Sequence, residues 1–324
     1  MRTFNISDIT KDNFKTKAIE VFHKQARNNL VYKEYIGRLN IDLNSIKKIS
    51  DIPFLPISFF KTHKVFDQNK TEVISFTSSG TTGINTSKHF VSDLSIYENA
   101  FIEGFEQFYK NINNYCILAL LPSYLERKGS SLIYMTEKLI ELSGHKNSGF
   151  YLDNLDDLSE ILEKLDKNNQ KTILLGVSYA LLDLIEKQNF KLKNTIIIET
   201  GGMKGQRKEM IKEEFYRILK DGFGVNKIHS EYGMTELLSQ AYSQNDGEYY
   251  TPAWMKVSIR DVNDPFCILE NGKSGGINII DLANIDSCSF IATQDIGRIN
   301  TNGSFSILGR FDNSDIRGCN LLIN

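Results

Sequence analysis

The chain has 324 residues, of which 41% are hydrophobic, and its 38 Lys and Arg nearly balance its 40 Asp and Glu. The net charge of −2 leaves no basic excess of the kind that nucleic-acid-binding proteins use, so we expect no nucleic-acid partner. No apolar run approaches the roughly 18–20 residues of a membrane helix, and the polar N-terminus does not resemble a signal peptide. Four widely spaced cysteines show no metal-type spacing. We therefore expect a cytoplasmic protein of enzyme size without a membrane span.

The first 65 residues combine a helical pattern with an irregular apolar segment. Phe14, Ala18, Phe22 and Ala26 recur at helical spacing. Residues 52–60 carry two prolines in an apolar context, and prolines at these positions exclude a regular helix. We expect this segment to be extended and buried.

Between residues 72 and 240, short apolar runs alternate with amphipathic stretches. The runs are typical of buried strands, which we expect at residues 73–76, 115–121, 172–177 and 195–200. Apolar residues at helical spacing predict helices around residues 94–108, 155–165 and 210–219. Strands alternating with helices predict an α/β fold with a largely parallel sheet flanked by helices.

The pattern changes after residue 240, where helical periodicity disappears. Short strand-like pieces separated by Gly, Asn and Asp occur at residues 256–260, 276–280, 289–292 and 304–308. They predict an antiparallel, barrel-like subdomain. We therefore expect an α/β acid- and nucleotide-binding core over residues 1–240 and a β-rich part over residues 241–324, together forming one domain.

The strongest chemical signal follows the expected strand at residues 73–76. Residues 78–89 hold six hydroxyl side chains, two glycines and a lysine, beginning Ser78, Ser79, Gly80, Thr81, Thr82, Gly83 and continuing to Lys88. Glycines let backbone N–H groups turn toward an anion, hydroxyls donate to phosphate oxygens, and lysine supplies a point charge. The Walker A pattern is absent. The segment is either a phosphate-binding loop or a polar surface loop.

Three further motifs follow in chain order. Residues 230–236 (Ser-Glu-Tyr-Gly-Met-Thr-Glu) offer a tight turn, a hydroxyl and a carboxylate suited to Mg²⁺, although a helix N-terminus has a similar composition. Asp295 lies in Thr-Gln-Asp-Ile-Gly-Arg, and Arg310 follows a glycine in the segment 309–320. An isolated Asp before a glycine is usually a turn residue. The four motifs in this order are difficult to explain as surface turns.

The series resembles the motifs of the adenylate-forming superfamily, which includes acyl-CoA ligases, nonribosomal peptide adenylation domains and luciferases. Residues 52–65 and 121–132 further resemble the acyl-protein synthetase (LuxE) branch. That branch activates a fatty acid with ATP and passes it, through a cysteine of its own, to an acyl-reductase partner. The resemblance spans about residues 15–322 and implies the adenylate-forming fold, with ATP and Mg²⁺ as cofactors.

The resemblance also implies roles for individual residues. Residues 78–83 and Lys88 would bind the β- and γ-phosphates. Gly201, Gly202 and Tyr232 would flank adenine, and Thr235, which follows Gly233 in the motif, would touch the α-phosphate. Glu236 would bind Mg²⁺, and Asp295 and Arg310 would hold the ribose. The sequence departs from the superfamily pattern between Gly83 and Lys88, where two extra residues occur and proline is absent.

Cys319 is a candidate acyl carrier. It lies close to Arg317, and a neighbouring cation lowers the pKa of a thiol. The alternative is a small hydrophobic residue that ends a strand. The family's self-acylating cysteine near the C-terminus favours the carrier role, whereas Cys116 lies in an apolar run and is expected in the core.

Two other candidates have structural alternatives. Residues 176–180 (Gly-Val-Ser-Tyr-Ala) resemble a hydrolase nucleophile elbow but lack its second glycine, so we reject that interpretation. His229, close to Glu231 and Tyr232, is either a residue of the acyl or adenylate pocket or a structural hydrogen-bonding group.

Adenylate-forming enzymes ordinarily continue past the hinge motif into a mobile C-terminal domain that carries a catalytic lysine. The sequence ends at Asn324, shortly after Arg310. We therefore expect that domain to be missing and Lys88 to supply the charge of its lysine.

The predicted function is an ATP-dependent acyl-protein synthetase that adenylates a fatty acid or another carboxylic acid and transfers the acyl group to a protein thiol. The expected acceptor is a protein such as an acyl reductase. One alternative is an acid–CoA ligase of the phenylacetate type. Another is a catalytically silent nucleotide-binding module, which the retained Thr235, Glu236, Asp295 and Arg310 disfavour.

Overall fold

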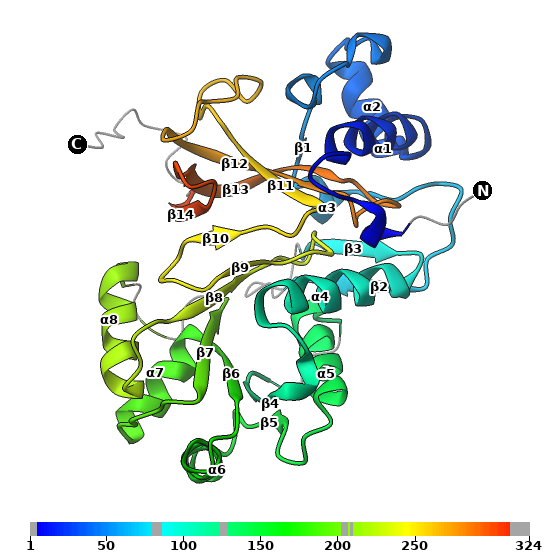
Figure 1. Cartoon of the computed structure of the whole chain (residues 1–324). Helices are drawn as coiled ribbons and strands as arrows, with labels where there is room; N and C mark the ends of the chain where they lie inside the picture. The colour runs from blue at the N-terminus through cyan, green and yellow to red at the C-terminus, as the bar shows by residue number, and fades with distance from the viewer. Residues whose placement is uncertain (1–4, 79–85, 123–128, 202–206, 208–209, 312–324) are drawn as a thin grey trace.

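The computed structural model describes residues 5–78, 86–122, 129–201, 207 and 210–311 (Figure 1). Its helices are α1 (Phe14–Asn28), α2 (Leu30–Arg38), α3 (Phe59–Thr62), α4 (Leu94–Tyr109), α5 (Ser131–Ser143), α6 (Leu155–Lys167), α7 (Ser178–Lys187) and α8 (Lys212–Phe223). Its strands are β1 (Leu55–Pro56), β2 (Ile74–Thr77), β3 (Lys88–Val91), β4 (Cys116–Leu120), β5 (Gly149–Phe150), β6 (Thr172–Val177), β7 (Thr195–Thr200), β8 (His229–Tyr232), β9 (Ala241–Ser243), β10 (Tyr249–Tyr250), β11 (Met255–Arg260), β12 (Ser274–Asp281), β13 (Phe290–Ile299) and β14 (Phe305–Arg310).

Twelve of the described strands form one sheet, and β2 and β3 form a separate antiparallel pair. The order in the large sheet is β11-β12-β13-β14-β10-β9-β8-β7-β6-β4-β5, with β1 beside β13. Strands β4 to β8 pair in parallel. From β8 through β9 to β11 every pair along this order is antiparallel.

This arrangement confirms the predicted α/β fold with its parallel core and antiparallel C-terminal strands. The antiparallel strands continue the parallel sheet, and those that the structure describes do not close into a barrel. Residue 240 falls between β8 and β9, which pair with each other. A division of the domain at that residue remains a prediction.

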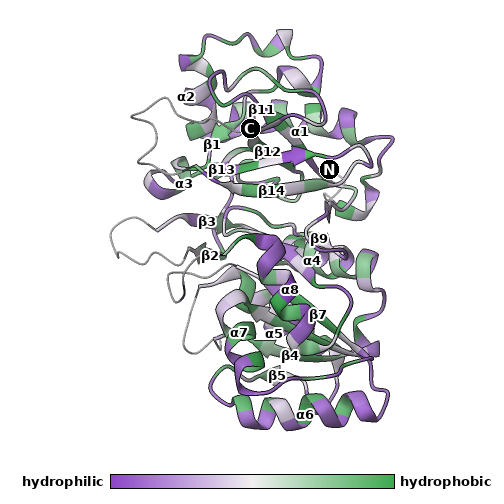
Figure 2. Ribbon diagram, turned by 90° about the vertical axis from the view of Figure 1, so that its left-hand side faces the viewer, coloured by the Kyte–Doolittle hydropathy of each residue, from purple (hydrophilic) through white to green (hydrophobic). Residues whose placement is uncertain are grey.

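Helices cover the parallel strands on both sides. Figure 1 shows α7 and α8 on one side of these strands and α4 and α5 on the other. Every residue of β4 and β6 is buried, as double coverage requires. Hydrophobic residues concentrate on the strands and on the inner helix faces, and α6 alternates between the two classes around its axis (Figure 2). No helix in the described ranges is long and apolar enough to cross a membrane.

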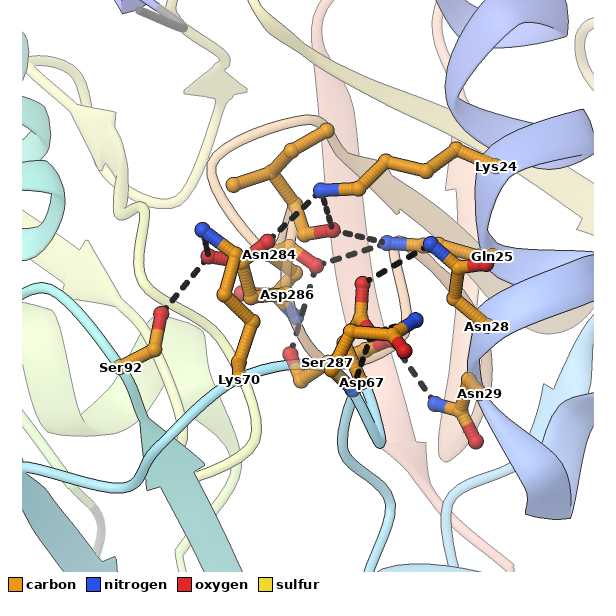
Figure 3. A network of polar contacts seen from close by, with 12 residues as sticks. Lys24, Gln25, Asn28, Asn29, Asp67, Lys70, Ser92, Asn284, Asp286 and Ser287 are labelled. Atoms are coloured by element: carbon orange, nitrogen blue, oxygen red, sulfur yellow. Dashed lines mark hydrogen bonds and ion pairs between the residues drawn. The ribbon is translucent and has the colours of Figure 1, made fainter.

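Helix α1 holds the backbone of the loop that joins β12 to β13, residues 282–289, here called the β12–β13 loop. Gln25 Nε2 donates to the carbonyl oxygen of Asn284 (2.8 Å), and Asn29 Nδ2 donates to that of Ser287 (2.9 Å). Figure 3 shows these amide side chains reaching from the helix to the loop. The position of the loop therefore depends on a helix some 250 residues earlier in the chain.

Asp286 adds a charged contact at the same loop. Its carboxylate contacts Lys24 Nζ (2.7 Å) and Lys70 Nζ (3.4 Å) and accepts from Ser92 Oγ (2.7 Å). Burial acts to raise the pKa of Asp286, but the bonds from Lys24 and Ser92 outweigh it and hold the pKa below its usual value. Asp286 thus joins three separate segments of the chain to the loop (Figure 3).

Asp281, the last residue of β12, holds a segment that follows β8. One of its carboxylate oxygens accepts from the N–H groups of Leu238 (3.0 Å) and Ser239 (2.9 Å). The other accepts from Ser239 Oγ (2.6 Å) and Ala283 N (3.0 Å). Burial raises the pKa of Asp281 to about 6, although the four hydrogen bonds stabilise its ionised form. An acceptor-only side chain is therefore required here.

We expect Asp281→Asn to lower the free energy of unfolding by about 2–4 kcal/mol, because its amide nitrogen would face backbone donors inside the core. Urea unfolding of both proteins measures the change. Asp264→Asn, in an exposed loop, is the control and should stay within about 0.5 kcal/mol of the parent. Equal stability of D281N and the parent would contradict this account.

Candidate active site

A cavity of about 710 Å³ lies at the carboxyl ends of β7 and β8, facing β13 and β14. In sheets with parallel strands, this is where ligand pockets form. Its described lining comprises Ile57, Ser178, Glu199, Gly201, Met210, Lys212, Phe215, Glu231, Tyr232, Gly233, Met234, Glu236, Tyr249, Gln294, Asp295, Ile307, Leu308, Gly309 and Arg310. Several of the predicted site residues therefore lie around one space.

Three predicted site residues form a connected group on one side of the cavity. The Tyr232 hydroxyl donates to Asp295 Oδ2 (2.7 Å), and Arg310 Nε lies 3.7 Å from Asp295 Oδ1. Asp295 and Arg310 face each other in the β13–β14 register. Burial raises the pKa of Tyr232 well above its usual value, so its hydroxyl remains a donor.

The segment around Asp295 differs from the turn that its Asp and Gly suggest. It lies inside β13, which continues to Ile299, and a shift of register between Ile296 and Gly297 interrupts its pairing with β14. A β-bulge redirects side chains without ending a strand. The irregularity thus lies next to the residue whose carboxylate faces the cavity.

The ends of the predicted phosphate loop meet each other. Ser78 N donates to the carbonyl oxygen of Ser87 (3.1 Å), and Ser87 N donates to Ser78 Oγ (2.9 Å). The Ser87 hydroxyl also interacts with the carboxylate of Glu236 and acts to lower its pKa. The end of the loop therefore lies beside the carboxylate predicted to hold Mg²⁺, although about 150 residues separate them in the chain.

Glu236 has the properties of a carboxylate that a cation would stabilise. Only 6% of the residue is exposed, and this burial raises its pKa. Ser87 opposes the rise most strongly, and the charges of Arg310 and Lys61 also oppose it. No group of three or more His, Cys, Asp or Glu in the described ranges is arranged to hold a metal ion. Mg²⁺ is commonly bound by one or two carboxylates together with phosphates, and Glu236 fits that mode.

The backbone at Thr235 and Glu236 is held by side chains from elsewhere in the chain. His89 Nδ1 lies 2.9 Å from the carbonyl oxygen of Thr235, and Asn284 Nδ2 donates to that of Glu236 (2.8 Å). The other ring nitrogen of His89 lies 2.8 Å from Ser287 Oγ. Burial lowers the pKa of His89 to about 4, so the ring is neutral near pH 7.

Lys88 lies on the opposite face of β3 from these contacts. Ser87 and His89 are buried, whereas Lys88 between them is exposed, as the alternation of side chains along a strand requires. Lys88 is not among the described residues that line the cavity. Its proposed charge-supplying role remains a prediction.

Several predicted site residues lie outside the described residues: Ser79, Gly80, Thr81, Thr82, Gly83, Gly202 and Cys319. Their roles also remain predictions. Gly201 lines the cavity with a positive φ of 73°, a conformation that favours glycine. At Gly233, a Cβ atom would collide with the Glu231 carboxylate.

The sequence analysis assigned no role to Lys212, which also lines the cavity. Its Nζ donates to the Tyr249 hydroxyl (2.9 Å) and lies 4.7 Å from the centre of that ring. Burial lowers the pKa of Lys212. In the sequence it is one of several lysines near an amphipathic helix, and nothing distinguished it from the exposed ones.

Two buried glutamates of the cavity also lacked a predicted role. Glu199 accepts from Ser178 Oγ (2.7 Å), and Glu231 accepts from Thr200 Oγ1 (2.5 Å). The signal that could have found them is a polar residue at the carboxyl end of an apolar run, where a buried parallel strand ends. Ser178 of the rejected elbow motif therefore bonds to a glutamate.

The charged residues of the described lining are mostly acidic. Four carboxylates line the cavity, against the cations Lys212 and Arg310. A ligand that carries several phosphates would need additional positive charge, because like charges repel strongly in a partly buried site. A divalent cation and backbone amides are the usual sources of that compensation.

The cysteines that the structure describes fall into two classes. Cys116 and Cys288 are buried, which raises the pKa of their thiols to about 11 and about 12. Cys267 is exposed. The predicted core position of Cys116 is confirmed, and neither buried thiol has the properties of a nucleophile.

Comparison with known families identifies the chain. A family profile for "Acyl-protein synthetase, LuxE" matches residues 127–324, more than half of the sequence. The chain belongs to the LuxE acyl-protein synthetase family. No sequence match was found among curated proteins.

Solved structures of adenylate-forming enzymes share the fold of this LuxE-family chain. ATP-bound MatB from Rhodopseudomonas palustris is 16% identical with a TM-score of 0.56, and the match covers 76% of this chain and 49% of MatB. A 2-hydroxyisobutyryl-CoA ligase in complex with 2-HIB-AMP is 12% identical with a TM-score of 0.68, covering 96% of this chain and 69% of the ligase. The chain thus spans about half the length of the MatB structures it matches.

His229, the first residue of β8, has a structural role in this LuxE-family chain. Its Nδ1 lies 3.3 Å from the Tyr109 hydroxyl, and it is not among the described residues of the cavity lining. Burial, with a smaller contribution from Lys227, lowers its pKa to about 4. Between pH 6.5 and 4 the unfolded chain therefore binds a proton at His229 that the folded chain does not.

We expect this difference to make the protein less stable as the pH falls from 6.5 toward 4. In His229→Gln the loss of unfolding free energy over this range should be smaller, because the titrating group is gone. Urea unfolding at half-unit pH intervals measures the two slopes. Subtracting one slope from the other cancels the contributions of other titrating groups, such as His89 and Asp281. Equal slopes would contradict the assignment of this pH dependence to His229.

Proposed function

We propose that the protein is an ATP- and Mg²⁺-dependent acyl-protein synthetase that adenylates a carboxylic acid, with long-chain fatty acids as the proposed substrates. The acyl group then passes to a protein cysteine thiol. The observation that carries the proposal is the contact between the end of the predicted phosphate loop and Glu236, beside the cavity lined by Tyr232, Asp295 and Arg310. Family membership and ATP-bound MatB support it.

In the first half-reaction, a carboxylate oxygen of the acid attacks the α-phosphorus of ATP. The bond from that phosphorus to the bridging oxygen breaks, and pyrophosphate leaves. Both reactants are anionic, so their approach requires positive charge and directed donors. Mg²⁺, when bound, neutralises part of the phosphate charge. Glu236 would hold it, Thr235 would donate to the α-phosphate, and Asp295 and Arg310 would hold the ribose.

In the second half-reaction, a thiolate attacks the carbonyl carbon of the acyl-adenylate. The bond between that carbon and the AMP oxygen breaks, so a thioester forms and AMP leaves, while the thiol proton passes to solvent. We propose Cys319 as this thiol, because Arg317 lies close by in the sequence and the buried thiols of Cys116 and Cys288 have raised pKa values. A partner such as an acyl reductase would then receive the acyl group.

A second candidate function is an acid–CoA ligase. The match of 96% of this chain to a 2-hydroxyisobutyryl-CoA ligase favours it. The acceptor would then be coenzyme A rather than a protein thiol. A free CoA thioester, formed without covalent labelling of the protein, would select this function.

The purified protein should catalyse acid-dependent ATP–pyrophosphate exchange in the presence of Mg²⁺, and EDTA should abolish it. The test uses saturated acids from acetate to palmitate, together with aromatic and hydroxylated acids. Glu236→Gln should lower the exchange rate at least about 100-fold, because the amide lacks the charge that binds the cation. Glu213→Gln, at an exposed position of α8, should retain the parent rate. Absence of exchange with every acid would reject the proposed function.

With a radiolabelled acid that supports exchange, the protein should acquire a label that hydroxylamine releases, as expected for a thioester. Cys319→Ser should lose at least about 90% of that label while keeping its exchange rate, because only the second half-reaction uses the thiol. Cys267→Ser is the matched control, since Cys267 is the exposed cysteine among the described residues. Label retained in C319S and lost in C267S would transfer the role to Cys267.

A further inference from the structure

His89, in β3, is a buried histidine that none of the predicted chemistry uses, and its ring contacts the backbone of Thr235. We propose that His89 is a positioning residue, which holds the backbone of Thr235, next to Glu236, in place against β3 and the β12–β13 loop. This inference rests on the proposed function. It concerns how the chain places two of its own groups.

The hydrogen bonds define which ring nitrogen carries the proton. The carbonyl oxygen of Thr235 can only accept, so the hydrogen of the 2.9 Å bond is on His89 Nδ1. Nε2 is then unprotonated and accepts from Ser287 Oγ at 2.8 Å. The Phe60 ring packs edge-on against the imidazole, with 5.6 Å between the ring centroids. Both nitrogens and the ring plane are thus constrained.

The support behind His89 is itself held in place. Ser287 belongs to the β12–β13 loop, and its carbonyl oxygen accepts from Asn29, the residue that follows α1. Asp286 next to it contacts Lys24 and Lys70 (Figure 3). The loop is fixed from several directions, so Ser287 does not follow a movement of the imidazole. The hydrogen bond to Ser287 therefore restrains the ring.

The same loop holds the residue after Thr235. Asn284 Nδ2 donates to the carbonyl oxygen of Glu236 (2.8 Å), and Asn284 Oδ1 accepts from Leu238 N (3.0 Å). Glu236 is therefore anchored by the loop directly. Thr235 is anchored to the loop through His89, whose imidazole bonds to the Thr235 carbonyl oxygen on one side and to Ser287 on the other.

The chain also places His89 close to Ser87, the described residue near the end of the predicted phosphate loop. Ser87, which is hydrogen-bonded to Ser78 and acts to lower the pKa of Glu236, lies two residues before His89 and is buried like it. In the β2–β3 pair, His89 lies opposite Phe76. The strand that begins at Lys88 and the backbone of Thr235 are thus joined through one imidazole. Small displacements of such groups are costly for phosphoryl transfer.

Three substitutions separate the two hydrogen bonds. In His89→Asn the amide nitrogen occupies the place of Nδ1 and can still donate to Thr235. In His89→Gln the amide reaches the place of Nε2 and can contact Ser287 but not Thr235. His89→Ala removes both bonds, and Ser287→Ala removes only the support. Each variant is assayed at least about 15 °C below its own melting temperature, so that unfolding does not enter the rates.

If His89 positions Thr235, H89N and S287A should each lose less than about threefold in the kcat of ATP–pyrophosphate exchange, because both keep the donor to Thr235 and lose only the support from Ser287. H89Q and H89A should lose kcat by about 10- to 100-fold with less than a threefold change in the KM for ATP. The reason is that the Thr235 hydroxyl, proposed to donate to the α-phosphate, would be misplaced for the charge that develops there in the transition state. Equal rates for H89N and H89Q would overturn the proposal. If H89Q does not fold, the comparison of H89N with H89A decides in the same way.

A structural readout keeps this test independent of the activity. In ¹⁵N-histidine NMR spectra, the His89 signals, assigned by their loss in H89N, should show a protonated Nδ1 and an unprotonated Nε2 at pH 7. A protonated Nε2 would overturn the proposal even in an active enzyme. If the tautomer is as expected but the parent catalyses no exchange with any acid, the proposed function fails and the positioning role fails with it.

Discussion

The site depends on how the backbone after β8 satisfies its hydrogen bonds. Residues 233–240 belong to no helix or strand, yet most of them are buried. Buried backbone groups require partners, and outside regular structure many of those partners are side chains. His89, Asn284 and Asp281 provide them, with bonds to the backbone of residues 235–239. Rigid side-chain bonds of this kind place Thr235 and Glu236 where a regular strand would not.

This requirement gives the N-terminal helix a part in the site although it contributes nothing to the cavity lining that the structure describes. Lys24, Gln25 and Asn29 hold the β12–β13 loop, and that loop holds the segment after β8. Substitutions on α1 are therefore expected to change the proposed activity through two intermediate contacts. Such effects are larger for groups that must be held within fractions of an ångström.

The sequence predicted the alternation of strands and helices, the order of the motifs and the acyl-protein synthetase branch. It did not predict α5 or α7, whose first residues lie in the segments 121–132 and 176–180, which were interpreted as motifs and not as helix starts. Nor did it distinguish Lys212 or His89 from other lysines and histidines, since their surroundings come from distant segments. The face occupied by Lys88 follows from strand alternation, but that strand was not predicted. Local pattern identified which motifs matter, and tertiary contacts decided which side chains face the cavity.

The reciprocal bonds between Ser78 and Ser87 have a consequence for how this family can vary. They close the chain at the base of the segment that joins the two serines, so the two strands keep their spacing whatever number of residues lies between them. The entropic cost of lengthening a closed segment grows only with the logarithm of its length. Insertions there, such as the two extra residues before Lys88, are thus nearly neutral for the fold. A change in the length of this segment can therefore leave the placement of His89, Thr235 and Glu236 unaltered.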